Sequence, residues 1–146
     1  MSAQARPAFW RSAAGTAAIE FAILAVPFLC MCFGVIEFGR ACWTMEALQE
    51  SAAQGARCIG VVSSACSSGG AYSASTAKTY IQGVASGWGI SLPTADITPT
   101  QSTTCAGVSG FSEVQISYTF STIVGKLIPS LSNQAISVNS CYPSGA

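Results

Sequence analysis

One long apolar run dominates the N-terminal third of the chain. Residues 21–36 contain sixteen positions without a charge, and residues 16–20 and 37–38 extend the run to 23 positions. As an α-helix rising about 1.5 Å per residue, this stretch is about 35 Å long. The hydrocarbon core of a bilayer is about 30 Å thick. The pattern therefore predicts one membrane-spanning helix over residues 16–39.

The helix is expected to continue beyond the membrane through residues 40–62. This segment has no proline and is rich in Ala, Glu, Gln, Leu and Met, which are good helix formers. Small and apolar residues recur every three or four positions and predict one packing stripe. Its members are Ala41, Met45, Leu48, Ala52, Ala56 and Ile59. Thr44 is expected on another face, so the stripe alone would pack against a globular head.

The period of the pattern changes twice in the rest of the chain. Residues 62–73 are rich in Gly and Ser and predict a loop, and residues 72–90 predict a second helix that stops near Gly87. The apolar period of this helix comes from Ala77, Tyr80, Ile81, Val84 and Trp88.

Three strands are then expected, over residues 95–105, 112–122 and 134–142. The first contains Pro99, which favours an edge position. In the second, Val114, Ile116, Tyr118 and Phe120 alternate with polar residues. An apolar connection, residues 123–133, separates the last two strands. The predicted fold class is α+β, with a long N-terminal helix, a second helix and an antiparallel sheet of about three strands.

Charge is scarce, and this excludes several classes of function. Only 8% of the residues are charged, where about 25% is typical of a soluble domain. Six basic and six acidic residues cancel, so the basic excess of a nucleic-acid-binding protein is missing. Without histidine, the chain lacks the commonest general base and metal ligand. We therefore predict no catalytic residues, no metal, no cofactor and no enzymatic activity.

The seven cysteines form two sets. One set, Cys30, Cys32 and Cys42, lies in or beside the apolar run, and the other lies in the polar remainder: Cys58, Cys66, Cys105 and Cys141. Four cysteines in a small exported domain predict two disulfides, for which three pairings exist. We favour Cys58–Cys66 with Cys105–Cys141, because each closes a plausible structural unit. Cys42 remains open between a free, an acylated and a cross-linked state.

Positive charge predicts the orientation of the span. Arg6 and Arg11 lie in a leader without acidic residues, which places the N-terminus in the cytoplasm. The head then lies outside, where disulfides form. Trp43 follows the span and is either a marker of the outer interface or an ordinary packed aromatic residue.

Three other interpretations of the apolar run fit less well. A secretory signal needs small residues at a cleavage site, and the best site, before Cys42, is spoiled by Glu37 and Arg40. None of the three N-terminal cysteines has the apolar and small residues that precede a lipoprotein cysteine. A buried helix of a soluble protein is usually shorter than this run.

A carboxylate near the start of the run, Glu20, has two explanations. It can lie at the lipid–water boundary, with Glu37 about 25 Å further along the helix at the opposite boundary. Its surroundings favour another. A basic leader, Gly15, four further residues, Glu20 and Phe21 at the start of an apolar span together resemble a type IV-like prepilin processing site.

The wider stretch, about residues 12–58, resembles the TadE-like family of minor pilins from tight-adherence systems. The resemblance rests on "EFGR" at residues 37–40 and on "AL", "AA" and "GAR" at residues 47–48, 52–53 and 55–57. It implies a leader over residues 1–15, a span over 16–39, a helical extension over 40–62 and a head over 63–146. It also implies cleavage between Gly15 and Thr16 by a prepilin peptidase, with Glu20 and Phe21 completing the processing site.

The resemblance further implies a non-enzymatic minor pilin or pseudopilin that is needed to assemble a Flp-type pilus. Its partners would be the prepilin peptidase, other pilins and pseudopilins, the inner-membrane assembly platform and lipid. It would cross the inner membrane once, with its head in the periplasm, or enter a cell-surface pilus. Glu20 would pair with the Thr16 amine of a neighbouring subunit or of its own chain and set the stagger of packed helices.

Two alternatives from other classes of protein remain. One is a membrane-anchored binding or adhesin module without a role in a filament. The other is an exported soluble domain that is cut near Cys42.

Overall fold

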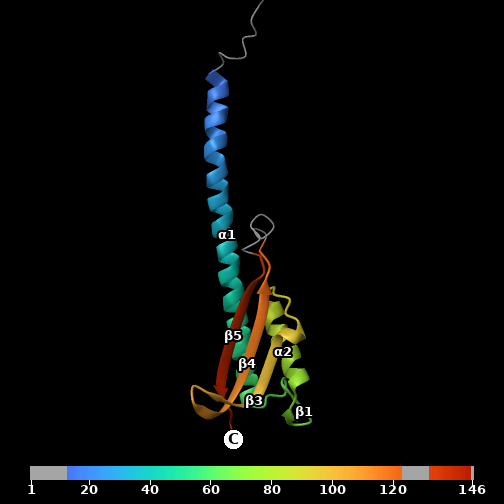
Figure 1. Ribbon diagram of the computed structural model, residues 1–146. Coiled ribbons are helices and arrows are strands. Elements are labelled where there is room, and N and C mark those ends of the chain that lie inside the picture. The colour runs from blue at the N-terminus through green and yellow to red at the C-terminus, as the bar shows by residue number, and fades with distance from the viewer. Residues whose placement is uncertain (1–12, 123–131, 146) are drawn as a thin grey trace, which may run out of the picture. The chain divides into compact units, whose positions relative to one another are not determined.

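The computed structural model describes residues 13–122 and 132–145, so residues 1–12 of the leader and most of the connection after residue 122 lie outside the described part. The chain divides into two compact units, Met1–Phe38 and Gly39–Ala146, called here the apolar unit and the head unit. The elements are α1 (Ala13–Gly60), β1 (Ser67–Ser68), β2 (Ala71–Tyr72), α2 (Ala74–Gly87), a short 3-10 helix η2 (Thr94–Asp96), β3 (Ile97–Cys105), β4 (Val108–Phe120) and β5 (Gln134–Pro143) (Figure 1). This layout confirms the α+β class.

The first helix is continuous over 48 residues. It includes the whole apolar run, runs through Pro27 without interruption and ends at Gly60. The apolar helix thus continues into the segment predicted as its extension, and it ends at Gly60, two residues before the predicted end at residue 62. Residues 39–60 of α1 belong to the head unit and supply part of its core.

The sheet of the head unit has the antiparallel order β3-β4-β5 (Figure 1). β3 is an edge strand, as Pro99 predicted, and its pairing with β4 has register shifts between Thr100 and Thr104. In β4 the side chains of Val114, Ile116 and Phe120 are buried, whereas those of Gln115, Ser117 and Thr119 are exposed. This alternation shows that one face of the sheet is covered and the other faces solvent.

The covering layer comes from α1 and α2, and here one expectation was wrong. Met45 was placed in the buried stripe but is 51% exposed, whereas Thr44 is 8% exposed and its hydroxyl donates a hydrogen bond to the Arg40 carbonyl at 2.9 Å. Adjacent helical positions differ by about 100°, so a shift of one position moves a side chain off the stripe. The observed stripe is Thr44, Ala47, Leu48, Ser51, Ala52, Gly55, Ala56 and Ile59.

The second helix ends at Gly87, as predicted, but Gly89 is the residue with a left-handed backbone, at φ +78°. Ala77, Ile81 and Ala85 are its buried residues, and Trp88 is exposed rather than part of the core. Before this helix, the predicted loop contains a two-stranded hairpin, β1–β2. The Tyr72 hydroxyl donates a hydrogen bond to the Pro99 carbonyl at 3.0 Å, and partial burial raises the pKa of this phenol.

At Gly55, α1 lies very close to Ile81 of α2. A Cβ atom at this position would lie 2.6 Å from Cγ1 and 2.8 Å from Cδ1 of Ile81, and 3.3 Å from Cγ2 of Val114. Ile81 is fully buried, so it cannot move without displacing its neighbours. Glycine is therefore required here by packing rather than by backbone conformation.

We expect Gly55→Ala to lower the free energy of unfolding by about 1–3 kcal/mol, the usual cost of overpacking. Gly83→Ala is the matched control, because Gly83 lies inside α2 and a Cβ there would meet nothing within 4 Å. This control should gain about 0.5–1 kcal/mol, since alanine is the better helix former. Denaturation of the full chain in detergent, followed by near-ultraviolet circular dichroism, measures both. Equal effects of the two substitutions would contradict the packing argument.

A second link joins the end of α1 to the sheet. The Ser112 hydroxyl lies 2.8 Å from the Ala56 carbonyl and 3.1 Å from the Tyr142 carbonyl, so one buried side chain on β4 connects α1 with β5. Close by, the backbone N–H of Gly145 donates to the Gly60 carbonyl at 3.1 Å. These contacts fix the C-terminal end of α1 on the sheet.

The head unit contains two disulfides, Cys58–Cys66 and Cys105–Cys141, which is the pairing favoured from the sequence. The first ties the end of α1 to the segment before β1. The second ties the end of β3 to β5, across a separation of 36 residues. Cys30, Cys32 and Cys42 are free among the described residues, and Cys42 is exposed.

Removing the longer disulfide by Cys105→Ala with Cys141→Ala is expected to lower the free energy of unfolding by about 4 kcal/mol. This value follows from the entropy that a 36-residue loop regains in the unfolded chain. Cys42→Ala, which removes an exposed free thiol, should leave the free energy unchanged. Denaturant titrations of the three chains under non-reducing conditions test this, and an unchanged midpoint in the double variant would contradict it.

Candidate functional site

The predicted processing segment lies in the first two turns of α1. Gly15 and Thr16 belong to its first turn, where backbone N–H groups lack partners inside the helix and the ends fray. A Cβ at Gly15 would meet nothing within 4 Å. Glycine inside a helix is less stable than alanine by about 0.5–1 kcal/mol. Packing within the described chain therefore gives no reason for glycine at position 15.

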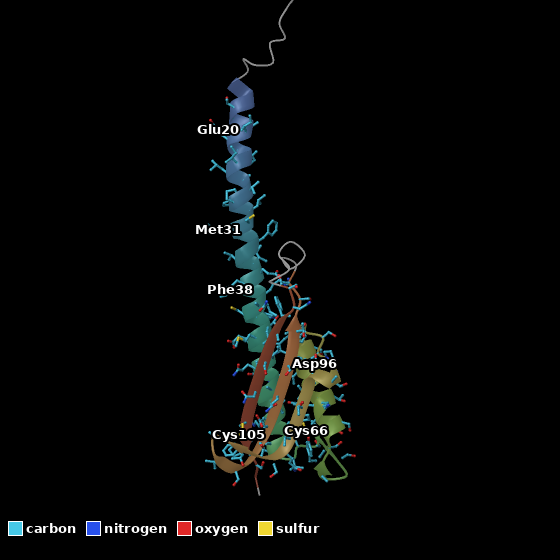
Figure 2. The ribbon with its side chains drawn as sticks, viewed as in Figure 1. Glu20, Met31, Phe38, Cys66, Asp96 and Cys105 are labelled. Atoms are coloured by element: carbon cyan, nitrogen blue, oxygen red, sulfur yellow. A yellow bond between two sulfur atoms is a disulfide. The ribbon has the colours of Figure 1, made fainter. Side chains whose placement is uncertain are left out.

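Glu20 presents its carboxylate at the surface of the apolar unit (Figure 2). Its neighbours in the sequence, Ile19 and Phe21, are 62% and 73% exposed. Thr16 precedes Glu20 by four residues, so the two lie on the same face, one turn apart. Within residues 13–122 and 132–145, no residue forms a hydrogen bond or ion pair with the Glu20 carboxylate.

Exposed large apolar side chains begin next to Glu20 and continue along the helix. Twelve of them between Ile19 and Phe38 are 50–73% exposed, and Met31 and Phe38 mark the middle and the end of this surface in Figure 2. None of the most apolar 18-residue stretch of this helix is buried. A core helix of a soluble protein would be mostly buried. By length and composition, α1 is the one candidate membrane span in the described part of the chain, as a membrane anchor requires.

The head unit holds an aromatic cluster that the sequence did not predict. The rings of Trp43 on α1 and Trp88 after α2 lie 5.2 Å apart with an edge-to-face angle of 62°. The Trp43 indole N–H donates a hydrogen bond to the Trp88 carbonyl at 3.3 Å. The guanidinium carbon of Arg40 lies 5.5 Å from the ring centre of Phe120, at the end of β4. Forty-five residues separate the two tryptophans, so no local pattern relates them.

No group of three or more His, Cys, Asp and Glu residues able to hold a metal ion occurs among residues 13–122 and 132–145. What the described part of this segment presents is one carboxylate, that of Glu20, and a large exposed apolar surface.

Comparison with known proteins identifies the same segment. Residues 15–57 match the family model of TadE-like proteins, so the match begins at Gly15 and includes Glu20 and the "EFGR" sequence. Neither the curated proteins nor the solved structures give a match. The resemblance inferred from the sequence is confirmed: over residues 15–57 the chain matches the TadE-like family model.

Proposed function

We propose that this chain is a minor pilin or pseudopilin of a tight-adherence, Flp-type pilus, and that it acts in assembly and not in catalysis. The observation that carries the proposal is the spacing of Gly15 and Glu20 at the start of a helix whose apolar first half is exposed, within the segment that matches the family. A prepilin peptidase, other pilins and the inner-membrane assembly platform are the proposed partners.

The first step is hydrolysis of the peptide bond between Gly15 and Thr16. Water adds across the C–N bond, which leaves a carboxylate on Gly15 and a new amine on Thr16. The bond lies in the first turn of α1, where few helical hydrogen bonds need to break for a protease to bind an extended segment. The basic leader keeps this end of the chain in the cytoplasm.

The second step is pairing of the new amine with a carboxylate. Removal of a charge from water is costly unless an opposite charge accompanies it. The Glu20 carboxylate has no partner in the described chain, and the Thr16 amine of a neighbouring subunit or of the same chain supplies one. The rest of the surface is apolar and does not by itself fix the position of one helix along another. This ion pair therefore sets the register between packed helices.

The head unit is the part that remains in the periplasm or on the cell surface. Its disulfides suit an oxidising compartment, and the helix that carries the span also supplies its core. Residues 39–60 of α1 thus belong both to this helix and to the head unit. In this position the head caps, primes or regulates the fibre.

The mass and N-terminal sequence of the chain extracted from its own membranes test the proposal. A chain that begins at Thr16 supports processing and assembly. A chain that begins at Met1 or Ser2 overturns the processing step and favours a permanently anchored binding or adhesin module. A chain that begins at Cys42 is an exported soluble domain, and no membrane role remains.

A further inference from the structure

The aromatic cluster lies near the start of the part of α1 that belongs to the head unit. Trp43 and Trp88, called here the tryptophan pair, are 57% and 36% exposed although their rings contact each other. Two large aromatic residues that pack against each other and stay exposed cannot be explained as head core. Their surface needs a covering of another kind, or it remains in contact with water.

The position of Trp43 along the helix indicates the depth of the pair in a membrane. Trp43 follows Phe38, the last large apolar residue of the exposed run, by five residues, or about 7.5 Å along a helix. The polar layer on each side of the hydrocarbon core is about 5–8 Å thick, half the difference between the two bilayer thicknesses. A span that ends near Phe38 therefore carries Trp43 into the layer of lipid headgroups.

The contact between the rings carries Trp88 to the same depth. The ring centres are 5.2 Å apart, and the Trp43 indole donates a hydrogen bond to the Trp88 carbonyl. The C-terminal end of α2 therefore lies at about the same depth in the membrane as Trp43. Arg40 lies one turn before Trp43 and approaches Phe120, the last residue of β4. One end of the head unit thus gathers two indoles and a guanidinium, groups that favour the membrane interface.

We infer that the tryptophan pair is a second membrane contact, through which the end of α2 rests in the headgroup layer of the outer leaflet. The occupant of this surface is lipid, and continuity with the span is the reason for that choice. The inference rests on the membrane-anchored form within the proposed function, but not on cleavage or on a filament. A single span would let the head rotate and tilt, whereas a second contact 45 residues away holds the head against the membrane until assembly removes the chain from it.

Tryptophan fluorescence of the full chain in vesicles of phosphatidylcholine, with bromine atoms placed high or low on the acyl chains, tests the inference. In the Trp10→Phe chain, the tryptophan pair is the only source of tryptophan fluorescence. The difference between this chain and Trp10→Phe/Trp88→Phe, which keeps Trp43, gives the part of the fluorescence that comes from Trp88, called here the Trp88 share. We expect bromines near the headgroups to quench the Trp88 share more strongly than deep bromines. Acrylamide in the water should quench it weakly.

Three other results overturn the inference. If the chain floats with the vesicles and Trp43 is quenched by bromine, but the Trp88 share is quenched only by acrylamide, the head stands off the membrane. If the chain floats but neither bromine nor acrylamide quenches the Trp88 share, the pair is covered by protein instead of lipid. If the chain does not float with the vesicles, the anchor itself is wrong. N-terminal processing is measured separately, so its failure leaves this result unaffected.

Discussion

A Gly15→Arg chain is expected to accumulate in the membrane with residues 1–15 still attached, and the shorter form should be nearly absent. A peptidase that cleaves after glycine must bring the backbone of this residue close to its catalytic groups, and a long side chain prevents that approach. The chain itself should tolerate the change, because a Cβ at position 15 would meet nothing within 4 Å and arginine is a better helix former than glycine. Intact mass of the membrane-extracted chain measures the ratio of the two forms.

Ser12→Arg is the control for this prediction, because it adds the same charge to the same leader outside the scissile bond. An added cytoplasmic arginine supports the orientation of the span in both variants. The control should be processed like the natural chain. If the Gly15→Arg chain is still cleaved before Thr16, the proposed role of Gly15 is wrong, although Thr16 would still be the mature N-terminus.

The parts of the fold that could be predicted are those fixed by local periodicity. The alternation through Val114, Ile116 and Phe120 predicted both the central strand and its buried face, because the side-chain period of a strand is two. Pro99 predicted an edge, since proline has no backbone N–H to donate to a neighbouring strand. The long helix followed from composition and the absence of breakers after Pro27.

One member of the stripe on α1 was not predictable in the same way. Leu48, Ala52, Ala56 and Ile59 are buried as predicted, but Thr44 is buried in place of Met45. The helix packs so closely at Gly55 that small residues line the contact, and the threonine hydroxyl is satisfied by its own helix. Hydrophobicity alone ranks methionine above threonine and therefore selects the wrong residue at this turn.

The candidate site also has one part that local sequence predicts and one part that it does not. The spacing from Gly15 to Glu20 is local, so the sequence presents it in full. The tryptophan pair depends on the packing of α2 against α1, and residues 45 apart give no periodic signal. The Glu20 carboxylate has no hydrogen-bond or ion-pair partner within residues 13–122 and 132–145, so its pairing with a Thr16 amine stays a prediction.

Loss of the Glu20 carboxylate should have the second large effect, because Glu20 is the one charge in the first half of the exposed apolar surface of α1. In a packed bundle, the new Thr16 amine would be left without its partner if residue 20 were apolar. Removing one member of a buried ion pair typically costs about 3–5 kcal/mol, or about a hundredfold or more in the equilibrium for each contact. Membrane insertion should not suffer, because a charge in the span opposes insertion.

Glu20→Ala is therefore expected to leave the chain in the membrane at its normal amount but to abolish pili, or nearly so, in cells that lack the natural chain. Electron microscopy of the cell surface and the amount of pilin released by shearing measure assembly, and membrane fractionation measures insertion. Glu46→Ala is the matched control, since Glu46 is an exposed glutamate of the same helix within the head unit, and this variant should assemble normally. Glu20→Asp keeps the charge and should retain part of the assembly. Normal pili in Glu20→Ala would show that the carboxylate does not set the register, and it would leave the lipid–water boundary as the explanation of this residue.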